Sequence, residues 1–349
     1  MAKLTPMMQQ YFEIKEQYKD CILFYRLGDF YEMFYDDALT ASKELGITLT
    51  GKNCGQEERA PMCGVPFHSC DSYINKLVSN GYKVAICEQM EDPSMCKGIV
   101  KRDVIRVVTP GTNLSTQTLE DAKNNYIMCV FYDETGIGAS FCDVTTGEFK
   151  TTQMKTLNEL IDEVNKFSPA EIICNEAFLI SGLDFNYIKD KIGAVVYNIP
   201  SYHFAEDSCE QIIREQFKVS NIQGLGLNDY PYGVVASGAL LSYLHETQKN
   251  SLHHLMTIVP YSTKGYMMID SSTRRNLELT ETMREKNKRG SLLWVLDKTK
   301  TAMGGRMLRS FVEQPLVNPV MIEARYDAIE ALKDNMITRE ELREYMQPI

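Results

Sequence analysis

Short apolar runs separated by turn-forming residues occupy the first 115 residues and predict a small mixed α/β domain. The run from Cys21 to Leu27 is rich in bulky apolar and aromatic residues, which is typical of a strand. Thr5 and Pro6 predict the start of a first helix, and the turn formers from Thr109 to Asn113 mark the end of the domain. The same reasoning predicts strands over 47–50, 82–87 and 104–108, and a helix over 71–78.

The stretch after Gly28 fits a helix. Asp29 is suited to the N-cap, and Glu32 occupies the third helical position of a capping box. One helical face then carries Phe30, Phe34, Ala38, Ala41 and Leu45. This pattern predicts a helix that begins at Phe30.

Residues 116–255 change to a strand meander followed by alternating helices and strands. Three strands are predicted over 126–132, 138–144 and 148–152, with turns between them at glycine. Helices are then predicted over 157–167, 204–217 and 234–244, and strands over 171–174 and 194–197. This order predicts an α/β layer fold for a second domain.

Residues 256–349 are helical in pattern. A helix is predicted from Ser291, and Asn318 followed by Pro319 opens another with one apolar face. The sequence therefore predicts an α/β multidomain chain with three parts: 1–115, 116–255, and the beginning of an all-α domain over 256–349.

Composition and charge refine this picture. The 349 residues are 44% hydrophobic, which is ordinary for a globular protein. No apolar run resembles a signal peptide or a membrane span, so we expect a cytoplasmic protein without a membrane partner. The net charge of −10 is concentrated in residues 116–260, whereas residues 1–115 carry −2 and residues 261–349 carry +2. A contact with DNA is therefore expected away from the middle of the chain.

Ten cysteines lack the paired spacing of a zinc site. Cys54, Cys63 and Cys70 lie near His68 in the sequence, but buried free thiols in a reducing compartment fit these positions better. No metal site is predicted.

The candidate chemistry lies in the stretch from Phe24 to Phe34, where an aromatic residue and a carboxylate follow a glycine turn. A Phe-x-Glu tripeptide alone is a weak signal. Further motifs occur along the chain: Ala60–His68, Val84–Gln89, Val107–Thr112 and Gly304–Arg309. With these motifs, the whole chain resembles the MutS family of DNA mismatch repair proteins.

The resemblance implies that residues 1–115 are a mismatch-recognition domain. In it Phe30 would insert from the minor groove and stack on a mispaired base, and Glu32 would hydrogen-bond that base. Among negatively charged phosphates, Glu32 would first have to take up a proton. Lys101 and Arg102 are the favoured phosphate contacts, ahead of Lys97 and Arg106.

For the rest of the chain, the resemblance implies a connector with a ribonuclease-H-like topology and the first part of a helical lever core. The expected partners are duplex DNA with mismatches or small loops, a MutL-type repair protein at the connector, and a second copy in a homodimer. ATP and Mg²⁺ are expected only for full-length family members, because the 349 residues contain no Gly-x-x-x-x-Gly-Lys-Ser/Thr motif. No cofactor and no catalytic site are predicted here.

Two alternatives remain open from the sequence. Asp133 and Asp143, near the early strands of the middle domain, are candidate metal ligands of a ribonuclease-H-like nuclease. The other alternative is an interaction fragment whose acidic connector binds repair proteins while its own affinity for DNA is negligible.

Overall fold

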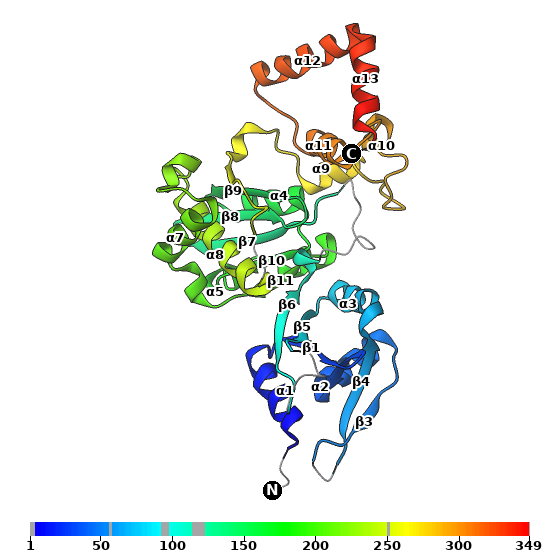
Figure 1. The fold of residues 1–349 in the computed structure, drawn as a ribbon. Coiled ribbons are helices and arrows are strands. Elements are labelled where there is room, and N and C mark those ends of the chain that lie inside the picture. The colour runs from blue at the N-terminus through cyan, green and yellow to red at the C-terminus, as the bar shows by residue number, and fades with distance from the viewer. Residues whose placement is uncertain (1–3, 56–57, 92–97, 114–122, 250–251, 349) are drawn as a thin grey trace. The chain divides into compact units, whose positions relative to one another are not determined.

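The computed structural model describes residues 4–55, 58–91, 98–113, 123–249 and 252–348, and strands within these ranges form two six-stranded sheets (Figure 1). The chain contacts divide into two units, Met1–Thr118 with Leu241–His254, and Leu119–Leu240 with Leu255–Ile349. The predicted mixed α/β class is confirmed. The predicted division into three domains stays a prediction.

The first unit contains a sheet with the strand order β3-β4-β2-β1-β5-β6. Its strands are β1 (Cys21–Leu27), β2 (Phe30–Phe34), β3 (Thr50–Lys52), β4 (Ala60–Pro66), β5 (Lys83–Gln89) and β6 (Arg102–Val108). Its helices are α1 (Pro6–Gln17), α2 (Tyr35–Leu45) and α3 (Cys70–Ser79), with short 3₁₀ turns at Phe67–Ser69 and Pro110–Thr112. The pairs β1–β2 and β2–β4 are antiparallel, whereas β1 and β5 are parallel.

Both faces of this sheet are covered by helices. On one face Met8 and Tyr11 of α1 pack against Tyr25 and Phe34. On the other face α2 and α3 pack against alternate residues of the same strands, including Tyr31. Alternation along each strand therefore sends neighbouring side chains into two separate cores.

The helix predicted from Phe30 is wrong over its first turn. Residues Phe30–Phe34 form strand β2, and α2 begins only at Tyr35. The strand lies between β1 and β4, and its pairing with β4 depends on residues about thirty positions away in the sequence. Tyr35 marks the change from strand to helix with a positive φ of 51°. Tertiary pairing overrides the helical spacing here, and Asp29 is not an N-cap.

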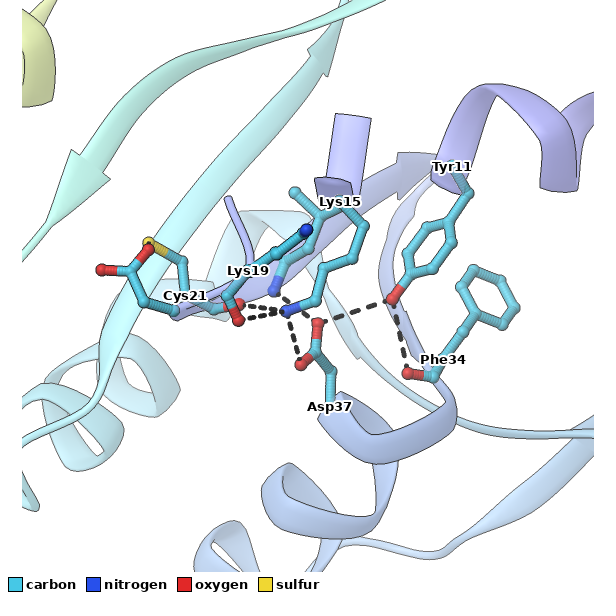
Figure 2. A network of polar contacts seen from close by, with 8 residues as sticks. Tyr11, Lys15, Lys19, Cys21, Phe34 and Asp37 are labelled. Carbon is cyan, nitrogen blue, oxygen red and sulfur yellow. Dashed lines mark hydrogen bonds and ion pairs between the residues drawn. The ribbon is translucent and has the colours of Figure 1, made fainter. Parts of the chain in front are cut away.

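A buried polar network fixes the end of the β1–β2 hairpin opposite its turn (Figure 2). The Asp37 carboxylate accepts a hydrogen bond from the Leu23 amide at 3.0 Å and forms an ion pair with the Lys15 ammonium at 2.9 Å. The Tyr11 hydroxyl lies 3.4 Å from both Asp37 and the Phe34 carbonyl oxygen. Burial raises the pKa of the Asp37 carboxyl, and the Leu23 amide and Lys15 oppose that rise. The network joins α1, β1, β2 and α2.

The second unit contains a sheet with the order β11-β10-β7-β8-β9-β12. The strands are β7 (Ile127–Asp133), β8 (Gly136–Asp143), β9 (Glu148–Met154), β10 (Glu171–Cys174), β11 (Val195–Asn198) and β12 (Val259–Pro260). The first three form the predicted antiparallel meander, and β10 and β11 add in parallel beside β7. This is the order expected of a ribonuclease-H-like topology.

Helices cover both faces of this second sheet. They are α4 (Leu157–Phe167), α5 (Glu176–Leu179), α6 (Phe185–Tyr187), α7 (Glu206–Phe217) and α8 (Pro231–Gln248), with short 3₁₀ or π turns at Ile188–Ile192, Ser201–Phe204 and Ile222–Leu225. Gly138 allows α8 to approach the sheet closely, because a Cβ at this position would lie 2.0 Å from the Tyr232 carbonyl oxygen. Helix α8 crosses the division between the two units after Leu240.

The remainder of the second unit is helical, as predicted. It contains α9 (Ser271–Asn276), α10 (Leu292–Leu296), α11 (Ala302–Glu313), α12 (Pro319–Asp334) and α13 (Met336–Met346), with a 3₁₀ turn at Thr263–Gly265. Ser291 and Asn318 cap α10 and α12 through their side chains. Among the described residues, no helix is both long and apolar enough to cross a membrane.

Candidate nucleic-acid interface

The β1–β2 hairpin presents an aromatic side chain to solvent directly after its turn. Leu27 pairs with Phe30, so the turn consists of Gly28 and Asp29 alone. Gly28 has a positive φ of 57°, a conformation that glycine adopts without steric cost. Phe30 is 46% exposed, whereas Tyr31 and Met33 are packed inward.

Groups from outside the turn hold its two carbonyl oxygens. The Arg26 Nε donates to the Gly28 carbonyl at 2.5 Å, and the Phe67 amide donates to the Asp29 carbonyl at 3.0 Å. The Arg26 guanidinium lies 3.5 Å from the centre of the Phe67 ring and pairs with Glu88 at 3.4 Å. These contacts hold the turn that carries Phe30 in one conformation.

Tyr31 extends this support beneath the hairpin. Its hydroxyl donates to Glu88, which also pairs with Arg26. Burial raises the pKa of Tyr31, and the hydrogen bond to Glu88 raises it further. The phenol therefore remains a neutral donor at neutral pH, and the contact is maintained.

Glu32 lies on the same face of β2 as Phe30 and forms an ion pair that the sequence did not reveal. Its carboxylate lies 2.5 Å from the Lys52 ammonium, with side-chain exposures of 16% for Glu32 and 32% for Lys52. On the neighbouring strand β4, the register partner of Glu32 is Gly64. A Cβ added to Gly64 would lie 3.6 Å from the Glu32 Cγ and 3.7 Å from the Phe30 Cδ1. Glycine at this position leaves the space beside both predicted reading residues open.

Arg102 occupies a different environment from the one expected of a phosphate contact. It is buried, and its guanidinium donates to the Arg26 carbonyl at 2.8 Å and to Gln10 at 3.1 Å. It also lies 5.0 Å from the Tyr25 ring, and burial raises the pKa of this tyrosine to about 12 although the Arg102 charge opposes the rise. The donors of Arg102 thus support β1, whereas Lys101 beside it is exposed.

The register brings the four predicted site residues to one end of the first sheet. Tyr25 pairs with Glu32 on one side and with Cys87 on the other, and Gln89 pairs with Arg102. Strands β2 and β6 are three positions apart in the sheet, or roughly 14 Å. Lys97, a weaker candidate, lies outside the described residues. Arg106 donates to the Thr112 carbonyl at 2.7 Å.

The two aspartates of the nuclease alternative do not share a site. Asp133 ends β7 at the β7–β8 turn, whereas Asp143 ends β8 at the opposite end of the same hairpin. Seven residues of extended strand separate these ends, which is roughly 20 Å. Asp143 is buried and accepts hydrogen bonds from Thr145 and Asn124, so its carboxylate has a structural role. A pair of metal ions about 4 Å apart requires ligands that converge, and these carboxylates do not.

Cys54 and Cys63 are buried in different cores, on opposite faces of the first sheet. Burial raises the pKa of the Cys54 thiol and raises that of Cys63 to about 11. Both side chains therefore behave as small apolar groups. In the part of the chain that the structure describes, no cluster of His, Cys, Asp and Glu side chains could hold a metal ion.

The sequence comparisons agree with this organisation. Family models for MutS domain I, MutS domain II and MutS domain III match residues 5–117, 125–256 and 272–349. DNA mismatch repair protein MutS of Lachnoclostridium phytofermentans is 62% identical over 349 residues. The proteins of the same name from Acetivibrio thermocellus and Clostridioides difficile are 53% and 51% identical over 352 and 350 residues.

These matches define a chain built from the first three domains of a DNA-repair protein family. The chain belongs to the MutS family. All of it is covered by the three relatives, but it spans only 37%, 40% and 36% of their respective lengths.

Sequence reasoning missed three residues that shape the site: Arg26, Lys52 and Phe67. Arg26 and Phe67 lie within the motifs that carry the family resemblance, and this was the available signal for them. Lys52 had no comparable signal, because its contact with Glu32 depends on how β3 pairs with β4.

Proposed function

We propose that this chain acts in DNA mismatch repair by binding duplex DNA at mispaired or unpaired bases. In this proposal Phe30 stacks on the base, and Glu32 forms a hydrogen bond with it. The observation that carries the proposal is an exposed aromatic side chain on a turn whose carbonyl oxygens are both held by other parts of the domain. Membership of the MutS family supports it.

The selectivity follows from the cost of opening a base step. A mispaired base is poorly stacked, so kinking the duplex there costs less than at a Watson–Crick pair. An aromatic ring that replaces the lost stacking contributes about 1–3 kcal/mol with little regard to base identity. Because the ring of Phe30 is already exposed and its turn is held, little conformational entropy is lost on binding.

The remaining contacts divide between DNA and protein partners. Lys101 is suited to a phosphate contact because it is exposed at the same end of the sheet. We further propose that the acidic middle of the chain contacts a MutL-type protein rather than DNA, since residues 116–260 carry a net charge of −10. For the longer family members we propose homodimers that use ATP and Mg²⁺.

The test is a titration of the 349-residue chain at fixed salt concentration against a matched duplex and duplexes with one G·T mispair or one unpaired thymine. The wild type is expected to prefer the two altered duplexes. Phe30→Ala should reduce that preference about 5- to 150-fold, while its binding to the matched duplex changes little.

Phe12→Ala is the matched control, because Phe12 is 40% exposed on α1 of the same unit. This variant should retain the preference for altered duplexes. Equal binding of all three duplexes by the wild type, or an equal loss in both variants, would refute the assignment of Phe30.

A further inference from the structure

The ion pair between Lys52 and Glu32 bears on how Glu32 recognises a base. Lys52 is the last residue of β3, a short strand whose Thr50 pairs with Met62 of β4. Its ammonium also lies 5.7 Å from the centre of the Phe34 ring, on the face of β2 that carries Glu32. Both partners are partly exposed, so the pair is accessible to a ligand that binds beside Phe30.

The other groups that face Glu32 come from the chain after β3 and from β1 and β4. The buried Cys54 thiol lies close enough for the two groups to interact, and burial keeps that thiol neutral. On β1 the register partner of Glu32 is Tyr25, whose ring is covered by the guanidinium of Arg102. Its partner on β4 is Gly64, which has no side chain. In the described part of the chain, Lys52 is the cation at ion-pair distance from Glu32.

The protonation state of Glu32 determines which base atoms it can bind. An ionised carboxylate only accepts hydrogen bonds, whereas a protonated one can also donate. Thymine N3–H and guanine N1–H are donors, but a purine N7 is an acceptor. DNA phosphates favour proton uptake by a nearby carboxylate, and a cation in contact with it opposes that uptake.

We propose that Lys52 holds the Glu32 carboxylate as a hydrogen-bond acceptor on DNA, and that it thereby sets a preference for unpaired bases that present a ring N–H donor, as thymine does and adenine does not. Lys52 is then a specificity-determining residue of the recognition site. This inference rests on the proposed function, because it assumes that Glu32 contacts the base. It requires Lys52 to remain close to Glu32 while the base is bound.

The first experiment records the carboxyl ¹³C chemical shift of Glu32 at pH 7 in the free 349-residue chain, with Glu32→Gln to assign the signal. Lys52→Met should move that chemical shift, because the carboxylate loses the ammonium that lies 2.5 Å away. Lys52→Arg should leave it near the wild-type value. Lys43→Met removes an exposed lysine on α2 of the same unit and should also leave it unchanged.

The second experiment compares binding to duplexes with an unpaired thymine or an unpaired adenine at pH 7 and fixed salt. The wild type should prefer thymine, and Lys52→Met should reduce that preference about tenfold. Lys52→Arg and Lys43→Met should retain it. Circular dichroism melting curves establish that each variant is folded.

The two proposals fail in different ways. If Lys52→Met leaves both the Glu32 chemical shift and the thymine preference unchanged while Phe30→Ala abolishes mismatch binding, the role of Lys52 is refuted and the proposed function stands. If the chemical shift moves but the thymine preference does not, Glu32 does not read the base and the inference fails at its premise. If Phe30→Ala has no effect, the proposed function itself fails.

Discussion

Two hairpins of this chain turn in the same number of residues but use their turns in opposite ways. The β1–β2 hairpin turns through Gly28 and Asp29, and the β7–β8 hairpin turns through Glu134 and Thr135. The residue after the first turn is Phe30, which is 46% exposed. The residue after the second turn is Gly136, where a Cβ would lie 2.6 Å from the ring of Tyr232. One turn presents an aromatic ring to solvent, and the other is covered by one.

The polar groups of the two turns are also satisfied differently. In the second turn Asp133 accepts hydrogen bonds from the amide and hydroxyl of Thr135, at 2.9 and 2.5 Å. That turn is held by its own residues and by the hydroxyl of Tyr232, which lies 2.6 Å from the Thr135 hydroxyl. In the first turn the donors are Arg26 and Phe67, and Arg26 is held in turn by Glu88. The difference teaches that an exposed aromatic residue is a better candidate for function when other parts of the domain hold its turn in place.

The largest expected difference between the two hairpins comes from removing Asp37, which supports the end of the first hairpin opposite its turn. Asp37→Ala leaves the buried Leu23 amide without its acceptor and the Lys15 ammonium with the Cys21 carbonyl oxygen but without its counter-charge. We expect a loss of about 3 kcal/mol in the free energy of unfolding of the first unit. Urea titration followed by hydrogen–deuterium exchange over residues 21–45 measures it.

Asp36→Ala is the matched control, because Asp36 is the exposed neighbour of Asp37 in the first turn of α2. It should cost less than about 1 kcal/mol. The β7–β8 hairpin should retain its protection against exchange in both variants. Similar losses in Asp36→Ala and Asp37→Ala would show that the buried network does not support the hairpin.

A smaller effect is expected from releasing the first turn while leaving Phe30 in place. Arg26→Met removes the hydrogen bond to the Gly28 carbonyl, the stacking on Phe67 and the pair with Glu88. Because the turn then samples more conformations, the preference for a mispaired duplex should fall about 3- to 10-fold. The titration used for Phe30→Ala measures this, together with amide exchange over residues 28–32.

Arg26→Lys tests whether the charge alone holds the turn, because lysine retains the positive charge but lacks the planar guanidinium. It should recover only part of the preference. Thr135→Val makes the corresponding change in the second turn and should leave DNA binding unchanged. A full preference in Arg26→Met would show that Phe30 does not depend on its held turn.

Much of the fold could be predicted from the sequence because local pattern and tertiary structure agree over most of it. The meander of β7, β8 and β9 has apolar strands and glycine-containing turns within a short stretch of chain. Strand β2 was missed because Phe30 and Phe34 are four residues apart, a spacing that also fits one helical face. Pairing with β4 settles the conformation, and a local pattern contains no information about that partner.

The candidate site was only partly predictable for the same reason. Phe30 and Glu32 were found through motifs that resemble a family, whereas periodicity alone placed them on a helix. The positions of Lys52 and Arg102 depend on neighbouring strands from distant parts of the chain. Sequence reasoning favoured Arg102 as a phosphate contact, and only the packed sheet shows that its guanidinium is used within the domain.

The smallest expected effect is a difference in pH dependence between the two hairpins. Burial raises the pKa of Asp37 above its unfolded value of about 3.9, so the pH-dependent part of its contribution to stability is present below that pH and is lost as the pH rises through the folded pKa. Hydrogen bonds from Thr135 lower the pKa of Asp133, so its contribution is present above about pH 3.9 and is lost as the pH falls.

Hydrogen exchange measures each contribution. The exchange of the two hairpins is followed between pH 3 and 7 in the wild type, in Asp37→Asn and in Asp133→Asn, and is corrected for intrinsic exchange rates. With rising pH, the advantage of the wild type should shrink at β1–β2 and grow at β7–β8. Trends of the same sign at both hairpins would contradict the comparison, because they would mean that the buried and the exposed aspartate are stabilised in the same way.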